Sequence, residues 1–267
     1  MIRILVAFAI TPVALVLFVR WLEPRFAFFP YRGETDTPAR FAVPFDAVPI
    51  TTADGERLRA WLLHAQAPHA LVVYFHGNGG NLSIWTPILA DIARRGYDVL
   101  AVDYRGFGVS TGSPTEQGLY RDADAVLDYL SSHRVRSLPI VYWGRSLGTA
   151  VAAYAASRTP PDRIVLEAGF PDARSLVRSS RPLAFLALFS TYRFATAGML
   201  ERVDRPILVI HGDADGVIPF ALGRALFERL NGRKTFLRIR GGDHNDLRPA
   251  DEASYWTAVD AFVRDAS

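Results

Sequence analysis

One stretch of the sequence sets a serine in the spacing that nucleophilic catalysis uses. Residues 144–148 read Gly-Arg-Ser-Leu-Gly and match the pattern G-x-S-x-G. The apolar run 140–143 precedes them and small residues follow, which predicts a strand, a sharp turn with Ser146 at its tip, and a helix. Glycine on either side of such a turn leaves room for close backbone, and the start of the helix directs N–H groups at developing negative charge. The pattern therefore favours Ser146 as a nucleophile over a solvent-exposed serine at a strand end.

A serine nucleophile needs a general base and an acid that orients the base. After a G-x-S-x-G turn the expected chain order is serine, acid, histidine, with the last two in loops that follow late strands. The loop after the apolar run 206–210 contains Asp213 and Asp215, and the loop after 235–239 contains His244. We predict His244 as the base and Asp215 as the acid. Asp213 is the alternative acid, but it lies nearer the strand end and is better placed to cap the turn.

Donors for an oxyanion are expected at two places along the chain. One is the backbone N–H of Leu147, and the other comes from the loop 76–81, His-Gly-Asn-Gly-Gly-Asn, after the apolar run 70–75. Its glycines allow a close backbone approach, and the N–H of Asn78 is the predicted second donor, a plain glycine-rich turn being the alternative. The histidines at strand ends, His76 and His211, are expected to bond loop backbone.

Binding patterns for other ligands are absent from the sequence. The loop 76–81 lacks the phosphate-loop pattern G-x-x-x-x-G-K-[ST], and residues 106–112 miss the dinucleotide spacing. The acidic loops fail the calcium-loop spacing, so we expect no metal and no cofactor. The net charge is +3, but the cations are scattered arginines with the single lysine Lys234, which gives no support for nucleic-acid binding. The absence of cysteine excludes disulfides and thiolate catalysis and leaves the compartment open.

The N-terminus is strongly apolar. Residues 4–19 form a run of 16 residues between Arg3 and Arg20, interrupted by Thr11 and Pro12. As a helix this run spans ~24 Å, short of a ~30 Å hydrocarbon core, and extending it through residue 22 adds about one turn. A cleaved signal peptide is the alternative, but no small-x-small cleavage site follows. We therefore expect a single-pass membrane anchor over 1–22, with the side of the remaining chain undetermined.

The rest of the chain reads as one domain. Residues 23–45 read as a linker or surface arm, within which 26–30 either lies along a membrane or packs on the domain. A hairpin over 47–64 precedes the buried run 70–75, and strands then alternate with helices to the end. This order predicts a three-layer α/β fold for residues 46–267, with a mostly parallel sheet that begins with an antiparallel hairpin.

From about residue 46 to the end, the chain resembles the α/β-hydrolase superfamily of serine hydrolases. Within it, the chain is similar to the membrane-anchored α/β-hydrolase-domain proteins that include protein depalmitoylases and their bacterial relatives. The resemblance implies the α/β-hydrolase fold, a catalytic triad of Ser146, Asp215 and His244, and a short cap inserted over 169–203. The depalmitoylases rely on a cysteine-rich N-terminus, which this chain lacks, so their substrate is not carried over. The matching stretches are 76–81, 103–116, 144–148, 211–219 and 242–246.

The sequence predicts the reaction class in more detail than it predicts the substrate. The apolar residues of the segment 169–203 either shelter an acyl chain or form an ordinary helix on the sheet. Hydrolysis of an ester or thioester of a small-molecule or lipid acyl substrate is the leading hypothesis. A peptidase or amidase on the same fold is one alternative, although no propeller or large gating domain is present. A non-catalytic binding module is another alternative, although such proteins usually lose a triad member and this sequence has a candidate for all three. The sequence does not indicate an oligomeric state.

Overall fold

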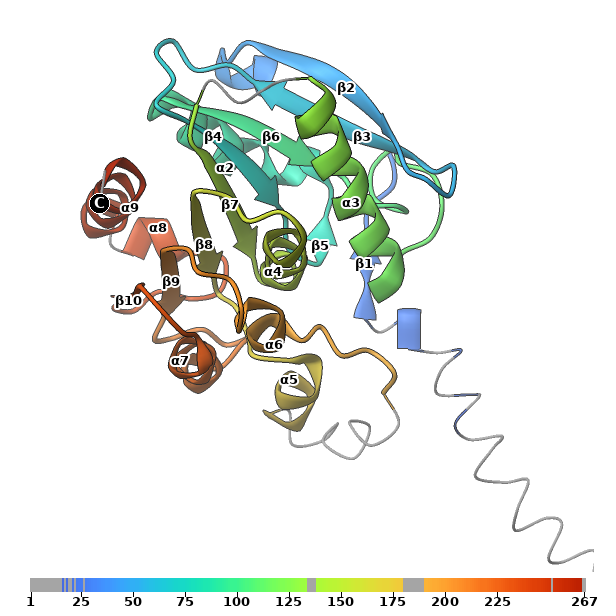
Figure 1. Cartoon of the computed structure of the whole chain (residues 1–267). Coiled ribbons are helices and arrows are strands. Elements are labelled where there is room, and N and C mark those ends of the chain that lie inside the picture. The colour runs from blue at the N-terminus through green and yellow to red at the C-terminus, as the bar shows by residue number, and fades with distance from the viewer. Residues whose placement is uncertain are drawn as a thin grey trace, which may run out of the picture.

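A computed structural model describes residues 16–265, except for 17, 19, 20, 22, 26, 134–137, 180–189 and 251. In this part of the chain a sheet of eight strands, in the order β10-β9-β8-β7-β4-β6-β3-β2, forms the centre of the molecule (Figure 1). Neighbouring strands from β10 to β6 are parallel, and β3 is antiparallel to both β6 and β2. The strands are β2 (Phe45–Thr51), β3 (Arg57–Leu63), β4 (Ala70–Phe75), β6 (Tyr97–Val102), β7 (Ile140–Arg145), β8 (Arg163–Glu167), β9 (Ile207–Gly212) and β10 (Lys234–Ile239).

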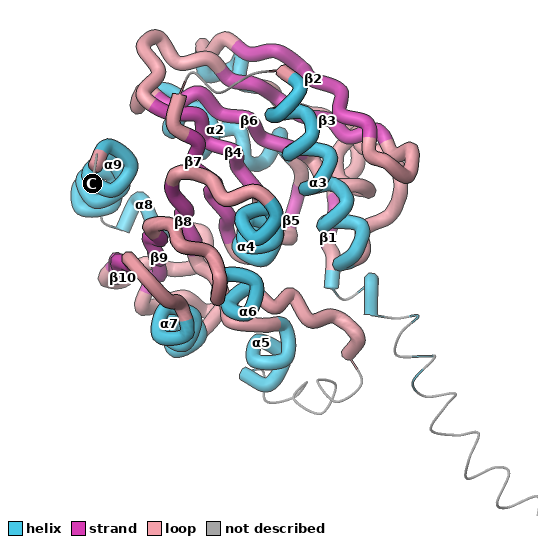
Figure 2. Tube along the Cα trace, viewed as in Figure 1, coloured by secondary structure: helices cyan, strands magenta, loops and turns pink. Residues whose placement is uncertain are grey.

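Helices cover both faces of the sheet, as Figure 2 shows. One core cluster contains apolar side chains of α3, α4, α6 and α7, and a second contains those of α2, α8 and α9. Every residue of β4 and β9 is buried, because strands between two helical layers meet no solvent on either face. The three-layer α/β fold predicted from the sequence is therefore confirmed. The helices are α2 (Leu82–Arg94), α3 (Glu116–Ser132), α4 (Gly148–Arg158), α5 (Ala173–Ser179), α6 (Thr196–Leu200), α7 (Phe220–Arg229), α8 (Leu247–Ala250) and α9 (Glu252–Arg264).

The segment before the hairpin lies against the domain. Its short strand β1 (Phe29–Pro30) pairs in parallel with β5 (Gly79–Gly80), and a 3-10 helix follows at Pro38–Phe41. Phe28 is buried, with its ring centroid 5.6 Å from that of Tyr192. Of the two interpretations of residues 26–30, packing on the domain is the one the described residues support.

The predicted single-pass membrane localisation is wrong. Among the described residues, no helix is long and apolar enough to cross a membrane. A spanning helix needs about 20 consecutive apolar residues, whereas the described helical residues near the N-terminus include Glu23, Pro24 and Arg25. Most of the predicted anchor over 1–22 lies outside the described residues.

The predicted cap segment is described in part. It contains α5, α6 and the stretch between residue 190 and α6. Both carboxylate oxygens of Glu116, the first residue of α3, accept backbone N–H groups of this stretch, from Arg193 and Phe194 at 2.7 Å each. The apolar run 183–189, which suggested an acyl-chain shelter, lies outside the described residues.

Candidate active site

Ser146 lies in a strained turn between β7 and α4. Its φ is +53°, a left-handed value that is uncommon for a residue with a side chain. The backbone around it is packed too closely for side chains. A Cβ on Gly144 would lie 2.3 Å from the backbone oxygen of Gly148, and a Cβ on Gly148 would lie 1.9 Å from that of Phe75. These distances give the physical reason for both glycines of the G-x-S-x-G pattern.

His244 and Asp215 meet in a buried hydrogen bond. His244 Nδ1 lies 2.8 Å from Asp215 Oδ2, and their side chains are 11% and 0% exposed. The second carboxylate oxygen, Oδ1, accepts the N–H groups of Val217 at 2.9 Å and Ile218 at 2.7 Å. Burial by itself would raise the pKa of Asp215, but the hydrogen bonds from His244 and these N–H groups outweigh it and lower the pKa. Because an ionised carboxylate only accepts, Nδ1 carries a proton, and in the neutral imidazole the lone pair is therefore on Nε2.

Asp213 has different partners, although it is only two residues away. Its Oδ2 lies 2.7 Å from Arg238 Nη2, and its Oδ1 accepts the Gly241 N–H at 2.7 Å. The structure therefore places Asp213 on the turn and Asp215 on His244, the arrangement preferred on sequence grounds.

Ser146, Asp215 and His244 follow the parallel strands β7, β9 and β10, whose carboxyl ends lie along one edge of the sheet. A hydrogen bond from Arg145 Nη2 to the His244 carbonyl oxygen, 2.6 Å long, joins the end of β7 to the loop after β10. Within the described residues, no hydrogen bond joins the Ser146 hydroxyl to the His244 ring. In free hydrolases this contact is often long and shortens when substrate binds.

The loop that contains Asn78 lies directly against the serine. A Cβ on Gly77 would be 3.4 Å from Ser146 Cβ. Among the described residues, the N–H groups of Asn78 and Leu147, the two predicted oxyanion donors, donate no hydrogen bond.

The N-terminal arm holds this loop, a role that was not predicted from the sequence. Asn78 Nδ2 donates to the Ala27 carbonyl oxygen at 2.6 Å, and the Asn78 carbonyl oxygen accepts the Phe29 N–H at 3.4 Å. Asn81 Nδ2 donates to the Gly33 carbonyl oxygen at 2.7 Å. A two-residue strand is too short to produce a periodic pattern, and hence its pairing was not predictable from the sequence.

Comparison with known proteins places this chain in a family. The sequence profile described as the alpha/beta hydrolase fold matches residues 70–178. The uncharacterized membrane protein YNL320W of Saccharomyces cerevisiae is 31% identical over 240 residues, which cover 87% of this chain and 84% of the yeast protein. The chain belongs to the α/β-hydrolase superfamily. This hydrolase is also 32% identical over 195 residues to the lysophosphatidylserine lipase ABHD12 of Danio rerio, a match that covers 63% of the chain and only 51% of the lipase.

A solved structure with the same fold is the Pyrococcus furiosus esterase Pf2001, at a TM-score of 0.75. The sequences are 20% identical, and the match covers 89% of this hydrolase and 96% of the esterase. At this identity the likeness demonstrates the fold alone. Together, the family and the lipase relatives support hydrolase activity.

The histidines at the strand ends bond loop backbone, as expected from the sequence. His211 Nε2 lies 2.9 Å from the Ile218 carbonyl oxygen and therefore carries a proton, and burial lowers the pKa of His211. His76 Nδ1 lies 2.7 Å from the Gly77 carbonyl oxygen. Among the described residues, no cluster of three or more histidine or carboxylate side chains could hold a metal ion.

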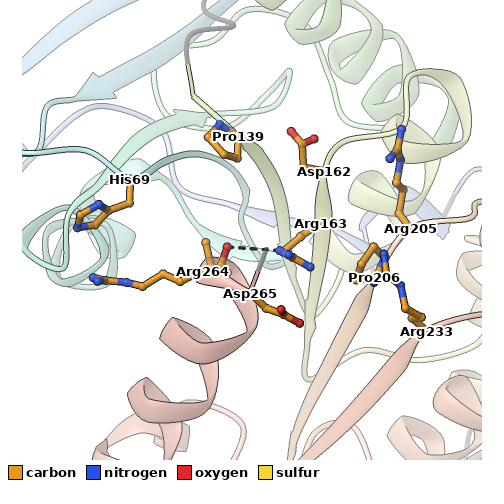
Figure 3. Close-up of a pocket in the computed structure, with 10 residues that line it drawn as sticks. His69, Pro139, Asp162, Arg163, Arg205, Pro206, Arg233, Arg264 and Asp265 are labelled. Carbon is orange, nitrogen blue, oxygen red and sulfur yellow. Dashed lines mark hydrogen bonds between the residues drawn. The ribbon is translucent and has the colours of Figure 1, made fainter. Parts of the chain in front are cut away.

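A cavity of about 580 Å³ opens at the opposite edge of the sheet (Figure 3). It lies where β4, β7, β8, β9 and β10 begin, and it contains none of the three candidate catalytic residues. This cavity is therefore separate from the candidate active site. Its lining includes His69, Asp162, Arg163, Arg205 and Arg264.

Proposed function

We propose that this protein is a serine hydrolase that cleaves carboxylic ester or thioester bonds of acyl substrates. The observation that carries the proposal is the 2.8 Å hydrogen bond between His244 Nδ1 and Asp215 Oδ2. It leaves Nε2 free to accept a proton, at the same edge of the sheet as the strained Ser146.

In the proposed reaction, Ser146 Oγ attacks the carbonyl carbon while His244 Nε2 takes the hydroxyl proton. The N–H groups of Leu147 and Asn78 donate to the oxygen that becomes negative. Asp215 stabilises the imidazolium, which then gives its proton to the departing alkoxide or thiolate and leaves an acyl-enzyme. Water, deprotonated by His244, attacks the acyl carbon, and the carboxylic acid departs as Ser146 regains its proton.

The proposed substrate class is a lipid or other acyl compound. Similarity to lysophosphatidylserine lipases favours an acyl ester, and it covers about half the length of those lipases. A thioester requires the same nucleophile, base and oxyanion donors, and it stays within the proposal for that reason.

A fluorophosphonate probe tests the nucleophile. We expect the wild type to be labelled and Ser146→Ala to lose labelling, while Ser157→Ala, an exposed serine on α4, keeps it. Labelling that survives in Ser146→Ala contradicts the proposal. Hydrolysis of p-nitrophenyl esters of increasing chain length, acyl thioesters and aminoacyl amides then tests the substrate class, and turnover of the amides alone contradicts an esterase.

A further inference from the structure

A buried ion pair lies immediately beside the candidate nucleophile. Arg145 and Glu167 are register partners at the carboxyl ends of β7 and β8. Arg145 Nη1 lies 3.1 Å from Glu167 Oε1, and the two side chains are 3% and 1% exposed. Neither residue takes part in the proposed proton transfers.

The surroundings of the pair fix both side chains. Glu167 Oε2 accepts hydrogen bonds from Trp143 Nε1 at 3.0 Å and from the Tyr255 hydroxyl at 3.1 Å. The Arg145 guanidinium lies over the Trp85 ring, 5.3 Å from its centroid. Burial alone would lower the pKa of Arg145, but the Glu167 charge together with the interactions of Tyr74 and Tyr255 outweighs burial and raises the pKa, so the guanidinium remains charged.

Stability alone is a poor explanation for such a pair. Removing two charges from water is expensive, and apolar residues of similar volume often stabilise a protein as well or better. The role of the pair is therefore better sought in a contact that apolar residues could not make. Arg145 makes one, because Nη2 donates to the His244 carbonyl oxygen at 2.6 Å.

The pair thus connects the nucleophile with the base. The Ser146 N–H donates to the Glu167 carbonyl oxygen at 2.8 Å, so the backbone of Glu167 holds the serine turn. Through the hydrogen bond from Nη2, Arg145 holds the backbone of His244. We propose that Arg145, fixed by Glu167, is a positioning residue that sets the backbone of the base relative to the nucleophile. The inference rests on the proposed function of Ser146 as the nucleophile and His244 as the base.

The geometry requires arginine in particular. Two different nitrogens of one rigid, planar guanidinium contact Glu167 and His244, whereas lysine has a single nitrogen on a flexible chain. Arg145→Lys therefore keeps the charge but cannot reproduce both contacts. A misplacement of the base by about 1 Å lowers turnover by about 100-fold.

The test compares Arg145→Lys with Arg105→Lys. Arg105 is a second buried arginine, and it bridges Asp122 and Asp54 at 2.8 Å each without contacting the candidate triad. We expect Arg145→Lys to lower kcat and the rate of fluorophosphonate labelling by about 100-fold, with KM within about threefold of the wild type. Arg105→Lys should lower the melting temperature comparably and keep wild-type kcat.

A double variant covers the case in which Arg145→Lys does not fold. Arg145→Met combined with Glu167→Gln leaves no unpaired buried charge and keeps an oxygen acceptor for Trp143 and Tyr255. We expect this folded double variant also to lose about 100-fold in kcat, because the bond to the His244 carbonyl oxygen is gone.

The outcomes separate the two proposals. Labelling of the wild type and the Arg145 variants at equal rates overturns the positioning role and leaves the triad intact. An equal loss of kcat in Arg105→Lys also overturns it, since the effect would then follow any buried arginine. Absence of labelling in the wild type overturns the proposed function, and the positioning role with it.

Discussion

Replacement of Asp215 by asparagine tests the orientation of His244 most directly. Asp215 Oδ1 accepts two backbone N–H groups, while Oδ2 faces His244 Nδ1 at 2.8 Å. In Asp215→Asn the amide oxygen stays with the two N–H groups, so the amide NH₂ faces His244. Nδ1 must then accept a hydrogen bond, which moves the ring proton to Nε2, the nitrogen that should receive the Ser146 proton.

The size of the effect is set by the free-energy cost of the side-chain arrangement that would restore the active tautomer of His244. The amide would have to rotate its NH₂ group onto the two backbone N–H groups of Val217 and Ile218, leaving both without an acceptor. Each buried donor without a partner costs about 1–3 kcal/mol, or about 2–6 kcal/mol for the two. We therefore expect kcat to fall by about 30-fold to about 10⁴-fold, at about 1.4 kcal/mol for each factor of ten.

Steady-state hydrolysis of p-nitrophenyl acetate measures this loss. KM should stay near the wild-type value, because Asp215 acts through His244 and the proposed mechanism gives it no contact with substrate. Asp213→Asn is the matched control, since Asp213 lies in the same loop as Asp215 but bonds Arg238 and Gly241. The kcat of this variant should remain within about threefold of the wild-type value. A folded Asp215→Asn protein that retains more than a tenth of wild-type kcat would refute the tautomer argument.

Two further predictions concern stability. Gly148→Ala should lower the free energy of unfolding in urea by about 3 kcal/mol or more, because its Cβ would lie 1.9 Å from a backbone oxygen. Gly198→Ala on α6, where the nearest atom is 3.9 Å away, should change it by about 1 kcal/mol at most, and equal effects would contradict the packing argument. Burial lowers the pKa of His211, so the native state should lose stability as the pH falls below about 6.5, where the unfolded imidazole binds a proton. Between about pH 7.5 and about pH 5.5 the loss of stability should be smaller in His211→Gln than in the wild type, and identical losses would show that His211 does not contribute.

Local sequence patterns predicted the elements around the site closely. The apolar run 70–75 is β4, and the strand and helix expected on either side of Ser146 are β7 and α4. These patterns succeed because a strand buried on both faces must be apolar throughout, and because the close backbone around the turn has room only for glycine. The contacts that hold the site were not predictable in this way. The pairing of β1 with β5 and the ion pair of Arg145 with Glu167 join residues that are distant in the chain, and neither leaves a periodic signal.

The apolar N-terminus shows the limit of composition. It suggested a membrane localisation, yet among the described residues no helix meets the length and apolarity that a membrane crossing needs. For residues 26–30 the sequence left open whether an aromatic segment faces lipid or protein. The contact of Phe28 with Tyr192 in the folded chain supports the second.

The sequence by itself determined the order of serine, acid and histidine, and the glycines around Ser146, because backbone sterics and strand order act locally. Only the tertiary structure decided which carboxylate faces His244. Asp213 and Asp215 lie two residues apart in one loop, so their distance from the strand end favoured Asp215 without excluding Asp213. Their partners come from β10 and the loop after it, since Arg238 and Gly241 bond Asp213, whereas His244 bonds the buried Asp215.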